Sequence, residues 1–180
     1  MFYLVSAPLT SVNLLKNDIG EAAADIVRAA EHHGKIQTLC GIKPDQKAAD
    51  FSGQRLKAAD AVLLAYDIKV NAPLTSVNLL RNDIGEAAAD IVRAAEQHGK
   101  IQTLCGIKPD QEKADFSSQS LKAADAVLLA YDLKVNATLT DLNLQQNDIG
   151  DEGAKAIAAV LPRCVQLQNG MYSAPSDARS

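Results

Sequence analysis

The fold is decided by one short pattern, which first occurs as Leu9-Thr10-Ser11-Val12-Asn13-Leu14-Leu15-Lys16-Asn17-Asp18-Ile19. Apolar residues alternate at Val12 and Leu14, which is the spacing of a short strand with one face in a core. Asn17 predicts a turn after the strand, because its side-chain amide can satisfy backbone groups in a loop. Ile19 is expected to fill the core behind that turn.

A helix is predicted directly after this turn. The segment from Gly20 to Gly34 is rich in alanine, and its apolar positions at 23, 26, 27 and 30 have helical spacing. A second strand, turn and helix follow, with Ala49-x-Phe51-x-x-Gln54-x-Leu56 in place of the first pattern and a helix over 57–70. Between the two, residues 36–45 predict a strand and a Pro-Asp turn with no helix.

The whole arrangement is duplicated with an offset of 65 residues. Residues 72–136 repeat residues 7–71 with seven differences: Lys16/Arg81, His32/Gln97, Lys47/Glu112, Ala48/Lys113, Gly53/Ser118, Arg55/Ser120 and Ile68/Leu133. A looser third copy of the first pattern runs from Thr138 to Gly150. Because one strand, turn and helix cannot cover its own apolar face, repeats of this kind are expected to stack around a continuous core.

The predicted fold class is therefore α/β, in the form of a solenoid with a 65-residue double-repeat unit. Strands are expected near 11–13, 38–40, 49–51, 76–78, 103–105, 114–116 and 141–143. Helices are expected near 21–33, 57–70, 86–98, 122–135 and 151–161.

Two runs carry a resemblance to a known family: Leu74-Thr75-Ser76-Val77-Asn78-Leu79-Leu80-Arg81-Asn82, and Leu139 to Ile157 with Leu142, Leu144, Asn147 and Ile149 in the pattern positions. They resemble leucine-rich repeats of the ribonuclease-inhibitor type, which also occur in NOD-like receptors and in activators of the small GTPase Ran. The resemblance covers about residues 7–161. It implies short parallel strands on a concave surface and helices on the convex one, although the helix-free segment 36–45 departs from the subtype.

The predicted domain is a solenoid over residues 1–161, followed by a disordered tail over 162–180. The tail is rich in Ser, Asn, Gly and Pro and has no periodicity. The first residues carry no polar cap, although solenoid ends need caps to stay soluble. We therefore expect a piece of a longer repeat array.

Composition and charge exclude several classes of partner. The net charge is −4 and the basic residues are scattered, so no nucleic-acid partner is expected. No apolar run reaches the length of a membrane span, and no signal peptide is expected. The three cysteines include Cys40 and Cys105 at corresponding repeat positions. That spacing favours reduced, buried thiols in a cytoplasmic protein over disulfides.

No catalytic, cofactor-binding or metal-binding motif is found, so the chain is not expected to be an enzyme. His32 is interpreted as part of a solvated helix end rather than a metal ligand, since its counterpart is Gln97. Cys40 and Cys105 are interpreted as strand residues, with no base repeating beside them that would make them nucleophiles. The series Asn17, Asn82 and Asn147 is interpreted as loop-satisfying amides rather than a recurrent polar site.

The concave face is expected to bind a protein partner, and its residues lie between the core positions of each strand. They are Ser11, Asn13, Leu15, Lys16, Asp50, Ser52, Ser76, Asn78, Leu80, Arg81, Asp115, Ser117, Asp141, Asn143 and Gln145. Thr38, Cys40, Thr103 and Cys105 are expected to lie between these rows.

The predicted function is a non-catalytic scaffold for protein–protein interaction, within a larger sensor or adaptor. Two alternatives stay open. One is a GTPase-activating protein of the Ran type, with Arg81 at the strand-to-helix edge. The other is a structural repeat array without a partner. The sequence does not indicate an oligomeric state.

Overall fold

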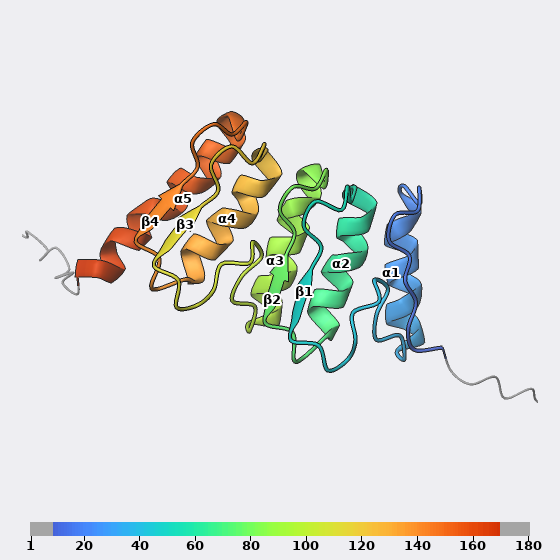
Figure 1. Ribbon diagram of the computed structural model, residues 1–180. Helices are drawn as coiled ribbons and strands as arrows, with labels where there is room; N and C mark the ends of the chain where they lie inside the picture. The colour runs from blue at the N-terminus through green and yellow to red at the C-terminus, as the bar shows by residue number, and fades with distance from the viewer. Residues whose placement is uncertain (1–8, 170–180) are drawn as a thin grey trace, which may run out of the picture.

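The computed structural model describes residues 9–169, with side chains described as far as Leu161. Helices stand side by side in chain order: α1 (Ala22–His33), α2 (Ala58–Val70), α3 (Ala88–His98), α4 (Ala123–Val135) and α5 (Gly150–Asn169). A 3-10 turn, η1 (Gly85–Ala87), precedes α3. Each helix packs against the next one along the chain. Short strands lie along one side of this row (Figure 1): β1 (Ala48–Asp50), β2 (Ser76–Asn78), β3 (Lys113–Asp115) and β4 (Asp141–Asn143).

The strands pair in parallel, as the alternation of apolar residues predicts. β1 pairs with β2, which places Ala49 opposite Val77. β3 pairs with β4, which places Ala114 opposite Leu142. Because side chains alternate between the two faces of a strand, these four residues point toward the helices and their neighbours point away.

The expected strands at 11–13, 38–40 and 103–105 are single bridges instead of strands. Ser11 bridges Thr38 and Ser76 bridges Thr103, both in parallel. The expected strands at 49–51 and 114–116 each begin one residue earlier. In the described residues the pairing forms three separate groups: 11–13 with 38–40, then β1 with β2 and 103–105, then β3 with β4.

Strand pairing stops after residues 38–40 because a carboxylate from a helix accepts hydrogen bonds from the backbone N–H groups of this segment. The carboxylate of Asp67, near the end of α2, accepts hydrogen bonds from the backbone N–H groups of Leu39 at 2.6 Å and Cys40 at 3.1 Å. It also accepts one from the Thr38 hydroxyl at 2.5 Å. Asp132 in α4 makes the same three contacts at 103–105. These donors are therefore satisfied without a further strand, as buried backbone groups must be.

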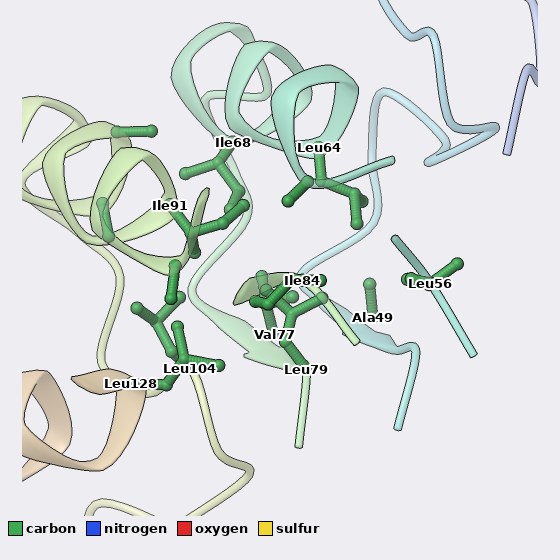
Figure 2. Close-up of a cluster of buried hydrophobic side chains, with 14 of the residues drawn as sticks. Ala49, Leu56, Leu64, Ile68, Val77, Leu79, Ile84, Ile91, Leu104 and Leu128 are labelled. Atoms are coloured by element: carbon green, nitrogen blue, oxygen red, sulfur yellow. The ribbon is translucent and has the colours of Figure 1, made fainter. Parts of the chain in front are cut away.

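The core is mainly aliphatic, since aromatic residues make up only 4% of the chain. Figure 2 shows Val77, Leu79 and Ile84 gathered in one cluster, with Ala49 and Leu56 on one side and Leu104 and Leu128 on the other. All these leucine and isoleucine side chains are at most 1% exposed. These side chains come from strands, turns and helices of several repeats. Burying each one stabilises the fold by about 1.5–3 kcal/mol.

The helix ends follow the expected signals at glycine. α1 stops at Gly34 and α3 at Gly99, both with left-handed φ values of 67° and 73° that glycine adopts without strain. The C-terminal end differs from expectation, because α5 continues beyond Leu161 to Asn169 where a tail was predicted. Pro162 lies within this helix. The rest of the predicted tail, residues 170–180, lies outside the described residues.

Candidate protein-binding surface

The outward side chains of the strands and bridges point away from the helices, and we call this set of residues the strand face. Strand alternation separates it from the core: Ala49, Val77 and Ala114 are at most 7% exposed, while their neighbours on each strand are half-buried or exposed. The strand face consists of Ser11, Asn13, Ala48, Asp50, Ser76, Asn78, Lys113, Asp115, Asp141 and Asn143.

Strand register brings predicted site residues from distant parts of the chain together. Asp50 lies opposite Asn78, and Asp115 lies opposite Asn143. Neither pair is close in sequence, so only the parallel pairing makes them neighbours. The predicted surface residues therefore form two rows across the strands. The first row contains Ser11, Ser76 and Asp141, and the second contains Asn13, Asp50, Asn78, Asp115 and Asn143.

Most of the polar residues in the second row share one local hydrogen bond. The side-chain oxygens of Asn13, Asp50, Asn78, Asp115 and Asn143 each accept a hydrogen bond from the backbone N–H two residues later, at 2.8–3.3 Å. This is an Asx turn, which ends each strand and fixes the side chain. Bonds to Ser117 lower the pKa of Asp115 below its usual range, so this exposed carboxylate is charged at neutral pH. The row therefore presents fixed, oriented acceptors.

Several predicted surface residues are not on the strand face. Leu80 is 3% exposed and belongs to the core, and Leu15 is half-buried against it. The chain turns at the next residue, where Lys16 and Arg81 have φ values near 60°, and this turn directs the preceding leucine inward. Ser52 and Ser117 are half-buried in the turns, whereas Gln145 is exposed.

The loop positions of Lys16 and Arg81 are held by buried aspartates. Their backbone N–H groups donate to Asp60 and Asp125 respectively, both at 2.7 Å. Asp60 and Asp125 also accept from the backbone N–H at the start of their own helices, α2 and α4, at 2.8 Å. Burial raises the pKa of Asp125. The Lys16 and Arg81 side chains remain exposed beside the strand face.

Thr38, Cys40, Thr103 and Cys105 were expected between the rows of surface residues, and all four are buried, at 1–3% exposure. The reason is the carboxylate of Asp67 or Asp132, which binds this segment beneath the helix. Burial raises the pKa values of both thiols far above their usual range, so they are inert rather than nucleophilic. Both cysteines are free and buried, as predicted; the Cys164 side chain lies outside the described residues.

The side-chain pKa values of Asp67 and Asp132 are strongly raised. Burial raises the pKa of Asp67 to about 6 and that of Asp132 to about 7, although their hydrogen-bond donors oppose the shift. Perturbed acidities often mark catalytic groups. Here each carboxylate is fully buried and saturated by donors from a neighbouring loop. The arrangement holds chain segments together and leaves no room for a substrate.

A hollow of about 520 Å³ opens over β3 and β4. Its lining includes the predicted residues Asp115, Asp141, Asn143 and Gln145, and also Lys113, which the sequence analysis missed. Lys113 lies opposite Asp141 and corresponds to Ala48 in the preceding copy. Starting the predicted strand at 113 instead of 114 would have placed it beside Asp115 on the same face.

A larger hollow of about 940 Å³ lies away from the strand face, at the C-terminal ends of α3 and α4. It contains the ion pair between Lys134 and Glu96 at 2.7 Å, and the exposed Val135. Its wall includes Gln102 and Pro109, from the segment where strand pairing is interrupted.

The remaining predictions about chemistry concern single residues and spans. His32 is exposed at the end of α1. Within residues 9–161 no group of three or more His, Cys, Asp or Glu side chains is arranged to hold a metal ion. No helix among the described residues is long and apolar enough to cross a membrane.

Comparison with known proteins adds one match. Among curated proteins, none matches this sequence. The family model described as Leucine Rich repeat matches residues 135–158, from the last residue of α4 through β4 into α5. The short parallel strands alternating with helices are compatible with the α/β fold of such repeats. This chain is thus similar to leucine-rich repeat proteins, whose repeats generally mediate protein–protein interaction.

Proposed function

We propose that this chain is a non-catalytic module that binds a protein partner on the strand face. The observation that carries the proposal is the set of oriented acceptors at Asp50, Asn78, Asp115 and Asn143, of which Asp115 and Asn143 line the hollow over β3 and β4. Side chains already fixed by the backbone lose little conformational entropy when a partner binds them.

The finer class of the fold is part of this proposal. We propose a solenoid of ribonuclease-inhibitor-like repeats in which the strand face is concave and the double repeat of 65 residues is the building unit. The recurrence of the same aspartate contacts at Asp67 and Asp132 supports the double repeat. We also propose that the chain works within a larger sensor or adaptor and in the cytoplasm, which the free thiols of Cys40 and Cys105 support.

The charges of the hollow indicate the chemistry of the partner. Asp115 and Asp141 are exposed carboxylates, and Lys113 is the basic residue beside them. The excess of negative charge favours a partner that brings a basic side chain to this point.

The experiment that tests this proposal uses photo-crosslinking from single positions. A photoreactive residue is introduced at Asp141 on the strand face or, as a control, at Glu152, which is exposed on α5. Crosslinked proteins are identified, and their affinity for the purified chain is then measured. The proposal requires crosslinks from Asp141 and not from Glu152, and an affinity lowered at least about tenfold by Asp141→Arg. Equal crosslinking from both positions, or unchanged affinity, would contradict it.

We also propose that the chain has no catalytic role, and Arg81 is the residue whose substitution tests this. The Arg81 loop conformation is explained by its backbone bond to Asp125, and Lys16 makes the same bond to Asp60. We expect the purified chain to leave the rate of GTP hydrolysis by Ran unchanged. A rate increase that Arg81→Ala abolishes would instead establish GTPase activation.

A further inference from the structure

Two segments of nearly identical sequence differ sharply in exposure. Leu9 is 59% exposed, while its counterpart Leu74 is fully buried. The same holds further along: Val12, Leu14 and Ile19 are only half-buried, whereas Val77, Leu79 and Ile84 are at most 1% exposed. Since the side chains are the same, the difference lies in what covers them.

The buried segment 74–84 is covered by the preceding repeat, residues 48–70. Ala49 of β1 pairs with Val77, and Figure 2 shows Ala49 and Leu56 beside Val77 and Ile84. α2 packs on α3 behind them. The segment 9–19 has α1 at the end of the row of helices in Figure 1, and no described residue takes the place of 48–70 beside it.

Hydrogen bonds between the two repeats show which backbone groups the covering repeat must provide. The Asn82 side chain accepts from the Leu56 N–H at 3.0 Å and donates to the Phe51 carbonyl at 2.9 Å. The backbone N–H of Asp83 donates to the Leu56 carbonyl at 2.8 Å. These contacts join one turn to the loop of the repeat before it.

The same three bonds recur at the next such boundary. Asn147 accepts from the Leu121 N–H at 3.0 Å and donates to the Phe116 carbonyl at 2.8 Å, and the N–H of Asp148 donates to Leu121 at 2.8 Å. The set is therefore a fixed feature of this boundary.

Asn17 makes the hydrogen bond within its own turn but, among the described residues, has no hydrogen bond to a preceding repeat. Its Nδ2 donates to the Leu14 carbonyl at 2.9 Å, as Asn82 does to Leu79. Among the described residues nothing donates to its Oδ1, and the backbone N–H of Asp18 has no acceptor. Segment 9–19 thus carries both the apolar side chains and the polar groups of a repeat boundary, without the repeat.

We propose that the face formed by residues 9–19, here called the open face, binds a repeat of the class of residues 48–70. The occupant has a strand with a small apolar residue at the Ala49 position. It also has a Phe-x-x-Gln-x-Leu loop whose backbone, at the Phe51 and Leu56 positions, meets Asn17 and Asp18.

A second copy of this chain does not fit as the occupant. The chain contains two repeats of the required class, 48–70 and 113–135. The first is covered by 74–84 and the second by β4 and α5. Both surfaces that match the open face are therefore already used within the chain.

The test inserts the missing class of repeat into the full chain. A duplicate of residues 36–71 is placed between Ser6 and Ala7, which recreates the natural junction of Asn71 with Ala72. A control insertion carries a Leu-to-Asp change at the duplicate's Leu56 position, which removes the apolar contact. Hydrogen exchange of the Asp18 N–H and the melting temperatures of Asn17→Ala and Asn82→Ala are then measured in each background.

In the original chain, Asn17→Ala should lower the melting temperature less than Asn82→Ala. In the extended chain the two losses should become equal, and the Asp18 N–H should exchange as slowly as the Asp83 N–H. The control insertion should restore neither. The proposal is overturned if Asn17→Ala and the Asp18 exchange are unchanged by the insertion, or if the extended chain folds no better than the control. A dimer of the original chain that Leu9→Asp abolishes would also overturn it, because a second copy would then be the occupant.

Discussion

The carboxylate of Asp132 in α4 accepts a hydrogen bond of 2.5 Å from the hydroxyl of Thr103, which lies 29 residues earlier in the sequence. The same carboxylate accepts from the backbone N–H groups of Leu104 and Cys105. A helix side chain thereby takes the place of a strand at the end of a pairing group. Asp67 and Thr38 have the same relationship.

Replacing one carboxylate oxygen of Asp132 with an amide nitrogen should weaken the fold. Asp132→Asn keeps the size of the side chain but replaces one acceptor oxygen with an NH2 group. At least one of the three groups that donate to Asp132 then loses its acceptor. We expect unfolding free energy to fall by about 1–3 kcal/mol, measured by urea denaturation. The matched control is Asp110→Asn at an exposed turn, which should change stability little. An equal loss in both variants would contradict the role of Asp132.

The same two carboxylates predict a pH dependence. Their pKa values are raised by burial from 3.8 to about 6 for Asp67 and about 7 for Asp132. Between pH 4 and 7 the folded state therefore binds more protons than the unfolded state, and stability must fall as pH rises through this window. The expected loss is on the order of a few kcal/mol.

Denaturation midpoints measured across this pH range test the prediction. The double variant Asp67→Asn with Asp132→Asn should flatten the dependence. Asp18 and Asp83 act in a different window, since their lysine partners lower their pKa values and their contribution is lost only as pH falls below about 4. A stability that rises between pH 4 and 7 in the native chain would show that Asp67 and Asp132 stay ionised.

Gly106 should tolerate alanine less well than Gly99. Both have left-handed φ values, 78° and 73°, which cost any other residue about 1–2 kcal/mol. A Cβ at Gly106 would also lie 3.2 Å from the Asn78 side-chain nitrogen, while a Cβ at Gly99 meets nothing within 4 Å. Gly106→Ala should therefore lower the melting temperature more, and it should displace Asn78 on the strand face. Equal losses would mean that Asn78 moves aside freely.

The burial of Leu80 predicts a difference between two leucines at corresponding positions. Leu80 is 3% exposed, and Leu15 is half-buried at the open face. Leu80→Ala should destabilise the protein by about 2–5 kcal/mol, as truncation of a buried leucine does, and Leu15→Ala by clearly less. Chemical denaturation of both variants gives the comparison. If Leu80→Ala were as mild as a surface change, the position would belong to the strand face after all.

Sequence periodicity predicts the five helices and the four strands among the described residues, because each depends on local spacing. The helix after Asn17 ends at Gly34 as expected, since glycine adopts the left-handed conformation that stops a helix. The boundaries of β1 and β3 differ from prediction by one residue, whereas the strands expected at 11–13, 38–40 and 103–105 are isolated bridges. Lys113 shares the outward face of Asp115 but precedes the predicted start of the strand at 114, so the prediction did not include it.

The candidate site was predicted less completely because exposure depends on neighbours. Cys40 and Thr38 alternate like surface residues of a strand, yet the carboxylate of Asp67 from α2 buries them. Nothing in the spacing of residues 36–45 indicates a contact with a helix residue so far along the chain. Leu80 is similar, since the turn at Arg81 directs it into a core that the strand pattern alone does not reveal.

The sequence by itself determined the alternation of strands, turns and helices, the aliphatic core and the near-identical double copy, because these follow from local spacing and side-chain type. Only the tertiary structure decided where strand pairing stops and which copies of a repeated side chain are covered. Leu9 and Leu74 have the same sequence around them, and one is exposed while the other is buried. The physical reason is that burial is a property of the repeat packed alongside, which a residue's own sequence neighbourhood does not contain.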